Sequence, residues 1–455
     1  MLRFIGNDVQ ITPLKKYVEK SLTVPGSKSI TNRVLLLSVL NKKRIVIKNV
    51  LVSDDTNYML DSLRKLGFTI HKEYFSRENE FPEIREFLDF IGSGVNDGLL
   101  VKLGGERIDD YKEVEIFTGN SGTTMRFLCS FVPLLNGRFL IDGEERMRER
   151  PIGDLTNALK QIGVNITDLN GFPPVFVQGE GRVRGGVVEI SGKLSSQYIS
   201  SLMLSAPMYD EGLEIRITDK LVSRPFVDLT SKLLEEFGVH SKNEDYKTIF
   251  IPRKELDREK EYFVEPDLTN AFYFLSIPAI VPSKITVYGV GKNTIQGDIE
   301  FLDVLKEIGC RVEVGERYIS VEGDGKPKGI EIDMNNIPDL VQTLAVIAMF
   351  GDRPTVIRNV YNLRVKETDR IKAIFNEITK VGGVVEEYKD GLKIVPQRHY
   401  IPSKISTYND HRMAMGFSLL GLRLEGIVIE NYRCTSKTFP SFWNYLEFIY
   451  SKHLY

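Results

Sequence analysis

The hydrophobic positions of the chain repeat one helical pattern that ends in glycine. An apolar pair with i, i+3 spacing is followed directly by glycine five times, at intervals of about 70 to 95 residues. This spacing places both apolar residues on one helical face, and glycine readily adopts the left-handed conformation that ends many helices. Each copy therefore predicts an amphipathic helix that stops before a strand. The copies are Leu63/Leu66/Gly67, Leu159/Ile162/Gly163, Leu234/Phe237/Gly238, Leu305/Ile308/Gly309 and Ile378/Val381/Gly382, with a sixth, lacking its glycine, around Leu446 and Ile449.

A second series of helices alternates with the first and is apolar on nearly every side. Helices of this kind belong inside a protein core. Short segments rich in valine and isoleucine lie between the two series and predict strands. The expected buried helices are 32–40, 123–135, 196–208, 269–280, 338–350 and 412–420, and the clearest strands are 44–50, 187–190, 285–290 and 356–360.

Six units of two helices and a few strands predict an α/β fold. The chain has 455 residues, 42% hydrophobic and 27% charged, which is a globular composition long enough for two or more cores. We expect two domains, each with three repeated units around buried parallel helices. The charged stretch 71–110 predicts a surface insertion without catalytic weight.

Charge and hydropathy exclude several classes of partner. The formal net charge is -2, so the chain lacks the basic surface that is typical of nucleic-acid binders. No apolar run approaches the roughly 18 to 20 residues that span a bilayer, so we expect neither a membrane segment nor a signal peptide.

The cysteines and histidines argue against a disulfide framework and a metal site. Cys129, Cys310 and Cys434 are far apart and form no CxxC motif, and none of the five histidines belongs to an i, i+4 pair. We interpret the cysteines as ordinary buried residues of a cytoplasmic protein, which requires no metal and no cofactor.

The polar turns that open the buried helices contain the candidate chemistry. A helix N-terminus presents unpaired N–H groups and a partial positive charge, which suit phosphate and carboxylate ligands. Serine, asparagine and aspartate at these positions also fit ordinary helix caps. Cations do not, because a cation there opposes the helix dipole unless an anion compensates it. The cations in or just beyond these turns are Lys28, Arg33, Arg126, Arg150 and Arg412.

Several of these turns belong to longer motifs that resemble the 5-enolpyruvylshikimate-3-phosphate synthase family. The ordered matches run from about Leu22 to Phe442. They comprise Pro25-Gly26-Ser27-Lys28-Ser29 with Asn32-Arg33, Gly119 to Arg126, Glu149 to Gly153, Ser195 to Tyr198, Gln296 to Asp298, Arg364 to Arg370, Tyr408 to Met415, Cys434-Thr435 and Lys437 to Pro440.

The resemblance implies a fold and an activity. The family fold, which resembles an inside-out α/β barrel, has two domains of three units joined by two crossovers. This implies an N-terminal domain 27–264, mainly for shikimate 3-phosphate, and a C-terminal domain, 1–26 plus 265–455, mainly for phosphoenolpyruvate and catalysis. The implied reaction transfers the enolpyruvyl group of phosphoenolpyruvate to the 5-hydroxyl of shikimate 3-phosphate in the pathway to chorismate. We expect a cytoplasmic monomer, or a plastid protein if a transit peptide has been removed.

The resemblance also assigns the binding residues. Bringing two phosphorylated acids together costs on the order of 4 kcal/mol for each close pair of like charges at an effective dielectric near 20, so matching cations are needed. For shikimate 3-phosphate the implied set is Lys28, Ser29, Arg33, Ser195, Ser196, Gln197, Ser223, Asp339, Asn362 and Lys366. For phosphoenolpyruvate it is Lys28, Asn120, Gly122, Thr123, Arg150, Gln197, Arg370, Arg412 and Lys437.

Two carboxylates are the candidates for proton transfer. By resemblance, Glu367 protonates the methylene carbon, Asp339 accepts the hydroxyl proton, and Lys28 assists the departing phosphate. Each carboxylate has a structural alternative: Asp339 also fits a helix N-cap, and Glu367 fits a salt bridge with Lys366 or Arg370. His411 fits equally a contact with substrate or a brace for Asp410.

Two other functions remain open. One is a related enolpyruvyl transferase that acts on a UDP-sugar, although that group typically carries a reactive loop cysteine. The other is an anion-binding module without catalysis, which the joint presence of the candidate catalytic residues disfavours. Departures from the family pattern, at Phe127, Phe226 and Leu363, put the response to the family inhibitor glyphosate in doubt.

Overall fold

The structure is a computed structural model that describes residues 1–77, 80–92, 97–107 and 112–451. Its chain divides into two compact units. The terminal unit contains Met1–Pro25, Phe75–Gly98 and Glu265–Tyr455, and the central unit contains Gly26–Tyr74 and Leu99–Val264. The sequence predicted an unbroken domain over 27–264, whereas here residues 75–98 group with the terminal unit.

The described strands form six four-stranded sheets, three in each unit, which confirms the predicted α/β class of repeated units. In the terminal unit the orders are β1(Leu2–Ile5)-β2(Asp8–Ile11)-β24(Ile427–Ile429)-β23(Lys404–Ile405), β17(Arg311–Val314)-β18(Tyr318–Gly323)-β16(Ser283–Tyr288)-β3(Val18–Leu22) and β19(Glu331–Asp333)-β20(Thr355–Arg358)-β22(Gly391–Val395)-β21(Val384–Tyr388). In the central unit they are β7(Lys112–Phe117)-β8(Asn136–Asp142)-β10(Phe172–Glu180)-β9(Asn165–Leu169), β11(Gly186–Ile190)-β12(Leu213–Ile217)-β14(Thr248–Ile251)-β13(Lys242–Glu244) and β15(Lys260–Phe263)-β4(Ile45–Val50)-β6(Asp97–Arg107)-β5(Phe68–Ser76).

The six sheets share one pairing scheme. In each, one edge strand pairs in parallel with its neighbour, and that neighbour pairs antiparallel with the next strand. A parallel pair needs a long crossover, which a buried helix supplies in four of the sheets, whereas the pairs β3/β16 and β15/β4 join segments more than 200 residues apart. The repetition seen in the hydrophobic pattern is therefore a repetition of topology.

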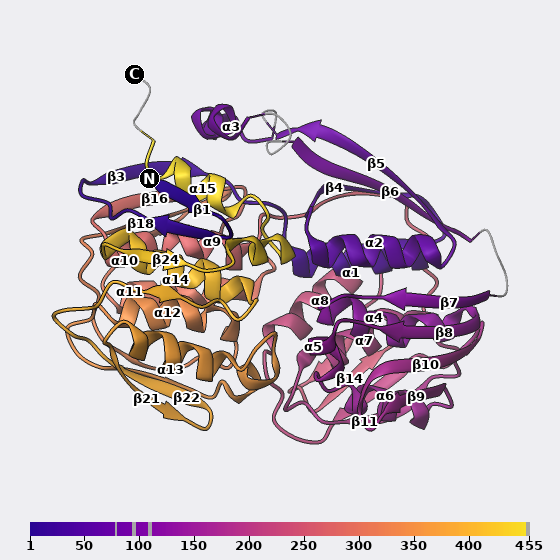
Figure 1. Cartoon of the computed structure of the whole chain (residues 1–455). Coiled ribbons are helices and arrows are strands. Elements are labelled where there is room, and N and C mark those ends of the chain that lie inside the picture. Colours follow the sequence, from indigo (N-terminus) through magenta and orange to yellow (C-terminus); the bar gives the residue numbers. More distant parts are fainter. Residues whose placement is uncertain (78–79, 93–96, 108–111, 452–455) are drawn as a thin grey trace. The chain divides into compact units, whose positions relative to one another are not determined.

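Six buried helices begin close to the predicted positions. Their residues are almost all buried because both helical faces are apolar. In the terminal unit, α12 and α14 lie between the sheet that contains β16 and β18 and the hairpin of β21 and β22 (Figure 1). The buried helices are α1(Lys28–Leu40), α4(Gly122–Phe131), α7(Ser196–Ser205), α9(Leu268–Leu275), α12(Val341–Ala348) and α14(His411–Arg423).

Six amphipathic helices form the second predicted series. The five glycines that end them have φ between 79° and 109°, the left-handed region where a side chain would be strained. These values confirm the glycine stop signals. The helices are α2(Asp54–Lys65), α6(Gly153–Gln161), α8(Pro225–Glu236), α11(Phe301–Glu307), α13(Arg370–Lys380) and α15(Phe442–Phe448).

Three buried helices are shorter than predicted because proline interrupts them. Proline lacks an N–H and cannot continue the hydrogen-bond ladder of a helix. Pro133, Pro207 and Pro278 each stand in the first turn of a new short helix. These short helices are η3(Val132–Leu134), η4(Ala206–Met208) and α10(Ile277–Ile280).

The stretch 71–110 is more than the predicted surface insertion. β6 is an inner strand of its sheet, and α3(Arg85–Ile91) buries Phe87, Leu88 and Ile91. The Phe87 ring lies 4.8 Å from that of Tyr445 and 5.1 Å from that of Phe448, between centroids. Charged residues on the exposed faces obscured this apolar pattern in the sequence. The predicted stretch also includes residues 78–79, 93–96 and 108–110, which lie outside the described part.

Among the described helices, none combines the length and apolar character needed to cross a membrane.

Replacing Phe87 by alanine should loosen α3 from the terminal unit. Truncating a buried phenylalanine costs about 3 kcal/mol or more, so hydrogen exchange of the α3 amides should accelerate about 100-fold. Phe90→Ala is the matched control, because Phe90 lies on the same helix with 43% of its surface exposed. Equal acceleration in both variants would contradict this docking.

Candidate active site

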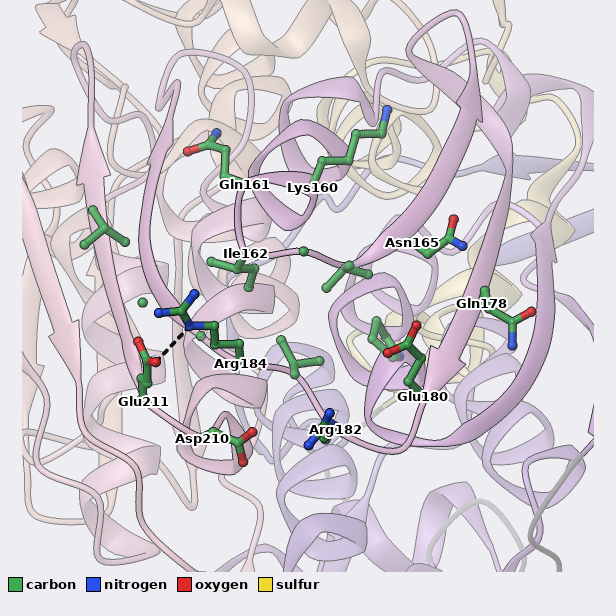
Figure 2. A pocket seen from close by; sticks show the side chains of 17 residues that line it. Lys160, Gln161, Ile162, Asn165, Gln178, Glu180, Arg182, Arg184, Asp210 and Glu211 are labelled. Carbon is green, nitrogen blue, oxygen red and sulfur yellow. Dashed lines mark hydrogen bonds and ion pairs between the residues drawn. The ribbon is translucent and has the colours of Figure 1, made fainter.

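The predicted site residues do not line the large open hollow of the central unit. Figure 2 shows this hollow, where the end of α6 meets the ends of β10 and β11. The cations Lys160, Arg182 and Arg184 line the hollow together with the acids Glu180, Asp210 and Glu211, and Arg184 donates to Glu211 over 2.8 Å. Because cations and carboxylates are balanced here, the hollow offers no concentrated charge to an anion.

One group of predicted residues surrounds the N-terminus of α4. Arg150 Nη1 donates to both Asn120 O and Asn120 Oδ1, at 3.1 Å each. Gly122, the first residue of α4, leaves room for two guanidinium groups: a Cβ there would overlap Arg126 Nη1 and lie 2.7 Å from Arg150 Nη2. The missing side chain thus permits two buried arginines at this N-terminus.

The N-terminus of α7 joins this group through Gln197. Ser195 caps α7 by accepting from Gln197 N at 3.2 Å. The Gln197 side chain accepts from Arg126 Nη1 at 2.8 Å and donates to Thr123 Oγ1 at 3.3 Å. Ser196 opens the helix and is buried. Helices α4 and α7 therefore present their N-termini to one cluster of polar groups.

Arg33 fixes α1 against this cluster. Its Nε donates to Thr230 Oγ1 at 2.8 Å, its Nη2 to Ser200 Oγ at 3.0 Å, and its Nη1 to Ser29 O at 2.9 Å. The main-chain oxygen of Phe226 also accepts from Nη2. All four partners are neutral oxygens, and burial lowers the pKa of Arg33. A nearby anion would compensate this cation.

Lys28 and Ser223 complete the predicted residues of the central unit. Lys28 Nζ lies 3.2 Å from Asp55 Oδ2, and Asp55 O accepts from Thr124 Oγ1 of α4 at 3.3 Å. Ser223 is buried, with a φ of 53°, just before α8. Such a left-handed serine is strained and is often retained for function. The central half-site thus comprises Lys28, Ser29, Arg33, Asp55, Asn120, Gly122, Thr123, Arg126, Arg150, Ser195, Ser196, Gln197 and Ser223.

The terminal unit contains a second cluster, built on Arg370. This first residue of α13 is 1% exposed and contacts three carboxylates. Its Nε and Nη2 bind Asp410 at 2.8 and 3.2 Å. Its Nη1 binds Asp339 at 3.0 Å, and Nη2 also binds Glu367 at 2.9 Å. Burial alone would lower the pKa of Arg370, but the three carboxylates outweigh it and raise that pKa.

Arg412 and Lys437 extend this cluster. Arg412 Nη2 lies 2.7 Å from Asp339 Oδ2, and its Nη1 lies 3.4 Å from the Tyr273 hydroxyl. Lys437 Nζ lies 3.5 Å from Glu367 Oε1. The terminal half-site thus comprises Asp339, Glu367, Arg370, Asp410, Arg412 and Lys437, with Asn362 and Lys366 in and directly after η7(Tyr361–Val365).

The structure shows whether the two candidate acids have the structural roles considered above, a helix N-cap for Asp339 and a salt bridge for Glu367. Asp339 lies inside η6(Pro338–Leu340) and caps no helix, and it bridges Arg370 and Arg412 instead. Glu367 does form the salt bridge with Arg370, and it also faces Lys437.

His411 Nδ1 lies 3.5 Å from Asp410 Oδ1, and both residues are buried. This long distance leaves both predicted roles of His411, a contact with substrate and a brace for Asp410, open.

Sequence reasoning missed two carboxylates of these half-sites. Asp410 was treated only as part of a motif, yet it caps α14 by accepting from Arg412 N at 2.9 Å while it holds Arg370. Asp55 follows Ser53 of a capping box in α2 and was not singled out. An acid next to a cap is a weak signal, because acidic residues are common in the first helical turn.

Within the described ranges, no group of three or more histidine, cysteine or acidic side chains is arranged to hold a metal ion.

Comparisons with known proteins agree on one family. The model for EPSP synthase (3-phosphoshikimate 1-carboxyvinyltransferase) matches residues 13–90 and 91–446. The chain is 40% identical to a 3-phosphoshikimate 1-carboxyvinyltransferase of Sulfurovum sp. (strain NBC37-1) over 98% of this chain and 100% of that relative. It is 41% identical to one of Shewanella halifaxensis (strain HAW-EB4) over 96% and 98%.

A solved structure shows the same fold. The EPSP synthase structure from Acinetobacter baumannii aligns with a TM-score of 0.73 at 23% identity, covering 96% of each chain.

Replacing Arg370 by methionine should strongly destabilise the terminal unit. Removing one partner of a buried ion pair costs about 3–5 kcal/mol, and here three carboxylates lose their shared cation. Their pKa values should then rise, so the loss should shrink as pH falls and they protonate. Unfolding midpoints at pH 5 and pH 8 measure this effect.

Arg358→Met is the control for this substitution. Arg358 forms an exposed pair with Glu331, which is worth at most about 1 kcal/mol. A similar loss in both variants, or a loss independent of pH in Arg370→Met, would contradict the role given to Arg370.

Proposed function

The chain belongs to the EPSP synthase (3-phosphoshikimate 1-carboxyvinyltransferase) family, and from this premise we propose how its two half-sites divide the reaction. The protein is a transferase of the shikimate pathway. It moves the enolpyruvyl group of phosphoenolpyruvate to shikimate 3-phosphate and releases phosphate. The proposal concerns the residues that bind and the residues that transfer protons.

The partners of the buried cations carry the proposal. In the central half-site, Arg33 and Arg126 donate hydrogen bonds to neutral oxygens. In the terminal half-site, Arg370 and Arg412 are held by carboxylates. A buried cation with neutral partners can bind the phosphate of a ligand directly. A carboxylate held beside a buried cation can instead give a proton to the substrate or take one from it.

We assign shikimate 3-phosphate mainly to the central half-site. The N-terminus of α7 supplies N–H groups, and Lys28, Ser29, Arg33, Ser195, Ser196, Gln197 and Ser223 supply polar side chains. The N-terminus of α4, where Gly122 leaves space beside the guanidinium of Arg150, is assigned to phosphoenolpyruvate together with Asn120 and Thr123. Residues 26–264, apart from 75–98, thus act as the domain that binds the acceptor.

We assign the acid and base to the terminal half-site. Arg370, Arg412 and Lys437 bind phosphoenolpyruvate, while Asn362 and Lys366 contact the acceptor. Glu367 gives a proton to the methylene carbon, which leaves the adjacent carbon electron-poor. The 5-hydroxyl of the acceptor attacks that carbon as Asp339 takes its proton. Glu367, now a carboxylate, then takes a proton back from the methyl group, and phosphate leaves beside Lys28 with the proton that Asp339 had accepted, which restores the double bond.

Substrate binding itself prepares these acids. In the structure, Asp339 and Glu367 satisfy Arg370, Arg412 and Lys437. When the phosphate and carboxylate of phosphoenolpyruvate contact Arg370 and Lys437, Glu367 shares these cations with the ligand, which favours the protonated form that can donate to carbon. Asp339 acts as a carboxylate, the form that accepts the hydroxyl proton.

The burial of the three thiols argues against the alternative function, a transferase that uses a UDP-sugar as acceptor. Cys129, Cys310 and Cys434 are all buried, and burial raises each thiol pKa to about 12. A thiol of this kind is not a nucleophile at neutral pH. None of the three therefore has the properties of the reactive loop cysteine expected for that group.

We further propose that the chain acts as a cytoplasmic monomer. One copy contains every residue assigned to both half-sites, and its three free buried thiols suit a reducing compartment.

A phosphate-release assay tests the acceptor. Phosphoenolpyruvate with shikimate 3-phosphate should release phosphate, and phosphoenolpyruvate with UDP-N-acetylglucosamine should not. Release only with the sugar nucleotide would refute the assignment, and release with neither would favour a binding module.

Replacing Glu367 by glutamine should lower kcat by about 10²-fold or more while sparing the affinity for shikimate 3-phosphate, because the amide cannot donate the required proton. Steady-state kinetics together with a binding titration measure both quantities. The exposed carboxylate Glu386, changed to glutamine, serves as the control. Unchanged turnover in Glu367→Gln would remove this residue from the mechanism.

A further inference from the structure

A left-handed turn directly precedes Asp410 and Arg412 in the terminal unit. It is closed by Asp410 N, which donates to Thr407 O at 2.9 Å. Its two central residues, Tyr408 and Asn409, have φ of 55° and 53°. Asparagine tolerates this conformation, but a bulky residue rarely adopts it, and turns with two left-handed residues consist mainly of glycine, asparagine and aspartate. Contacts from outside the turn are therefore needed to hold Tyr408.

Glu377 of α13 supplies these contacts. Its Oε1 accepts from the Tyr408 hydroxyl at 2.8 Å, and its Oε2 accepts from Ser406 N at 2.9 Å. The Glu377 side chain is 1% exposed, and Lys380 also pairs with it. A buried carboxylate with these donors has a fixed position. It therefore binds both the backbone before the turn and the side chain of the strained tyrosine.

The same helix also binds the residue that closes the turn. Arg370, the first residue of α13, donates through Nε to Asp410 at 2.8 Å. Glu377 follows seven residues later, about two turns along the helix. The left-handed turn is thus attached to α13 on both sides, by Glu377 and by Arg370. Its conformation decides whether Asp410 can reach Arg370.

The turn also leads into two segments that present cations of the terminal half-site. Asp410 caps α14 by accepting from Arg412 N at 2.9 Å. Asn409 Oδ1 accepts from Asn431 Nδ2 at 3.1 Å, and Asn431 directly precedes η8(Tyr432–Lys437). A change in the turn would therefore move the start of α14 and loosen the start of η8.

We propose that Glu377 is a positioning residue for the transfer reaction. It holds the turn in its left-handed form and thereby keeps Asp410 on Arg370 and Arg412 in place for phosphoenolpyruvate. The inference rests on the proposed assignment of phosphoenolpyruvate to these two arginines. Without Glu377, Tyr408 relaxes to a negative φ, and both arginines lose their positions.

The simpler interpretation is a salt bridge that only stabilises α13. Lys380 follows Glu377 by three residues, a spacing at which ion pairs stabilise a helix. Lys380 Nζ also donates to Lys404 O and Ser406 Oγ, at 3.3 Å each. This interpretation gives the Tyr408 hydroxyl no role in activity and predicts a loss of stability alone.

The test measures kcat and KM for each substrate in Glu377→Ala and Tyr408→Phe. Glu377→Ala should lower kcat/KM for phosphoenolpyruvate about 10²-fold, mainly by raising KM, because small displacements of binding groups have effects of this order. Tyr408→Phe removes one hydrogen bond to a charged group and should raise this KM about tenfold. KM for shikimate 3-phosphate should change much less, because that substrate is assigned mainly to the central half-site.

Asp303→Ala is the matched control. Asp303 forms the same kind of i, i+3 pair with Lys306 on α11, another of the amphipathic helices. Loss of this pair should leave KM for both substrates unchanged.

A second substitution at position 408 separates positioning from stability. Glycine adopts a positive φ without strain, so adding Tyr408→Gly to Glu377→Ala should restore most of the affinity for phosphoenolpyruvate. The same change should not raise the melting temperature, because glycine increases the conformational freedom of the unfolded chain. A purely structural role predicts that the two losses add.

The inference is overturned by an unchanged KM for phosphoenolpyruvate in Tyr408→Phe, by an equal rise in KM for both substrates, or by no recovery in the double variant. If Glu377→Ala does not fold, Tyr408→Phe decides alone, since Tyr408 is 38% exposed and loses only its hydroxyl. Any of these results with an active wild type refutes only the inference. A wild type that releases no phosphate refutes the proposed function as well.

Discussion

The terminal half-site depends on one buried guanidinium. Arg370 is almost inaccessible to solvent, so its charge is tolerable only because Asp339, Glu367 and Asp410 surround it. Those carboxylates stand on η6, before α13 and before α14, segments far apart in the chain. The same ion pairs that neutralise Arg370 therefore fix the relative positions of the candidate acid and base.

The two half-sites differ in the partners of their buried arginines. In the central half-site, Arg33 and Arg126 donate to neutral oxygens. In the terminal half-site, carboxylates hold Arg370 and Arg412, and under the proposed function substrate anions replace part of these pairs.

Much of this architecture could be predicted from the sequence. The glycines after the apolar pairs identified five helices, because these glycines adopt the left-handed conformation that ends a helix. The cations in the polar opening turns indicated anion binding, and the family resemblance of the longer motifs supplied the candidate residues. Helix ends were less predictable: Pro133, Pro207 and Pro278 start new turns inside apolar runs that otherwise look continuous.

Contacts between distant segments could not be predicted. Asp410 looks like a simple cap in the sequence, and only tertiary packing shows that it holds Arg370. Phe87 lies in a charged stretch, and its apolar neighbours Tyr445 and Phe448 follow more than 350 residues later. A pattern within one segment carries no information about such partners.

The most direct test of the whole account is an experimental structure with shikimate 3-phosphate bound. The phosphate should contact the N-terminus of α7 and Lys28 in the central half-site, while Arg370 keeps its carboxylate partners. A phosphate that replaces Asp339 on Arg370 and Arg412, or one that binds in the hollow of Figure 2, would contradict the division of roles between the half-sites.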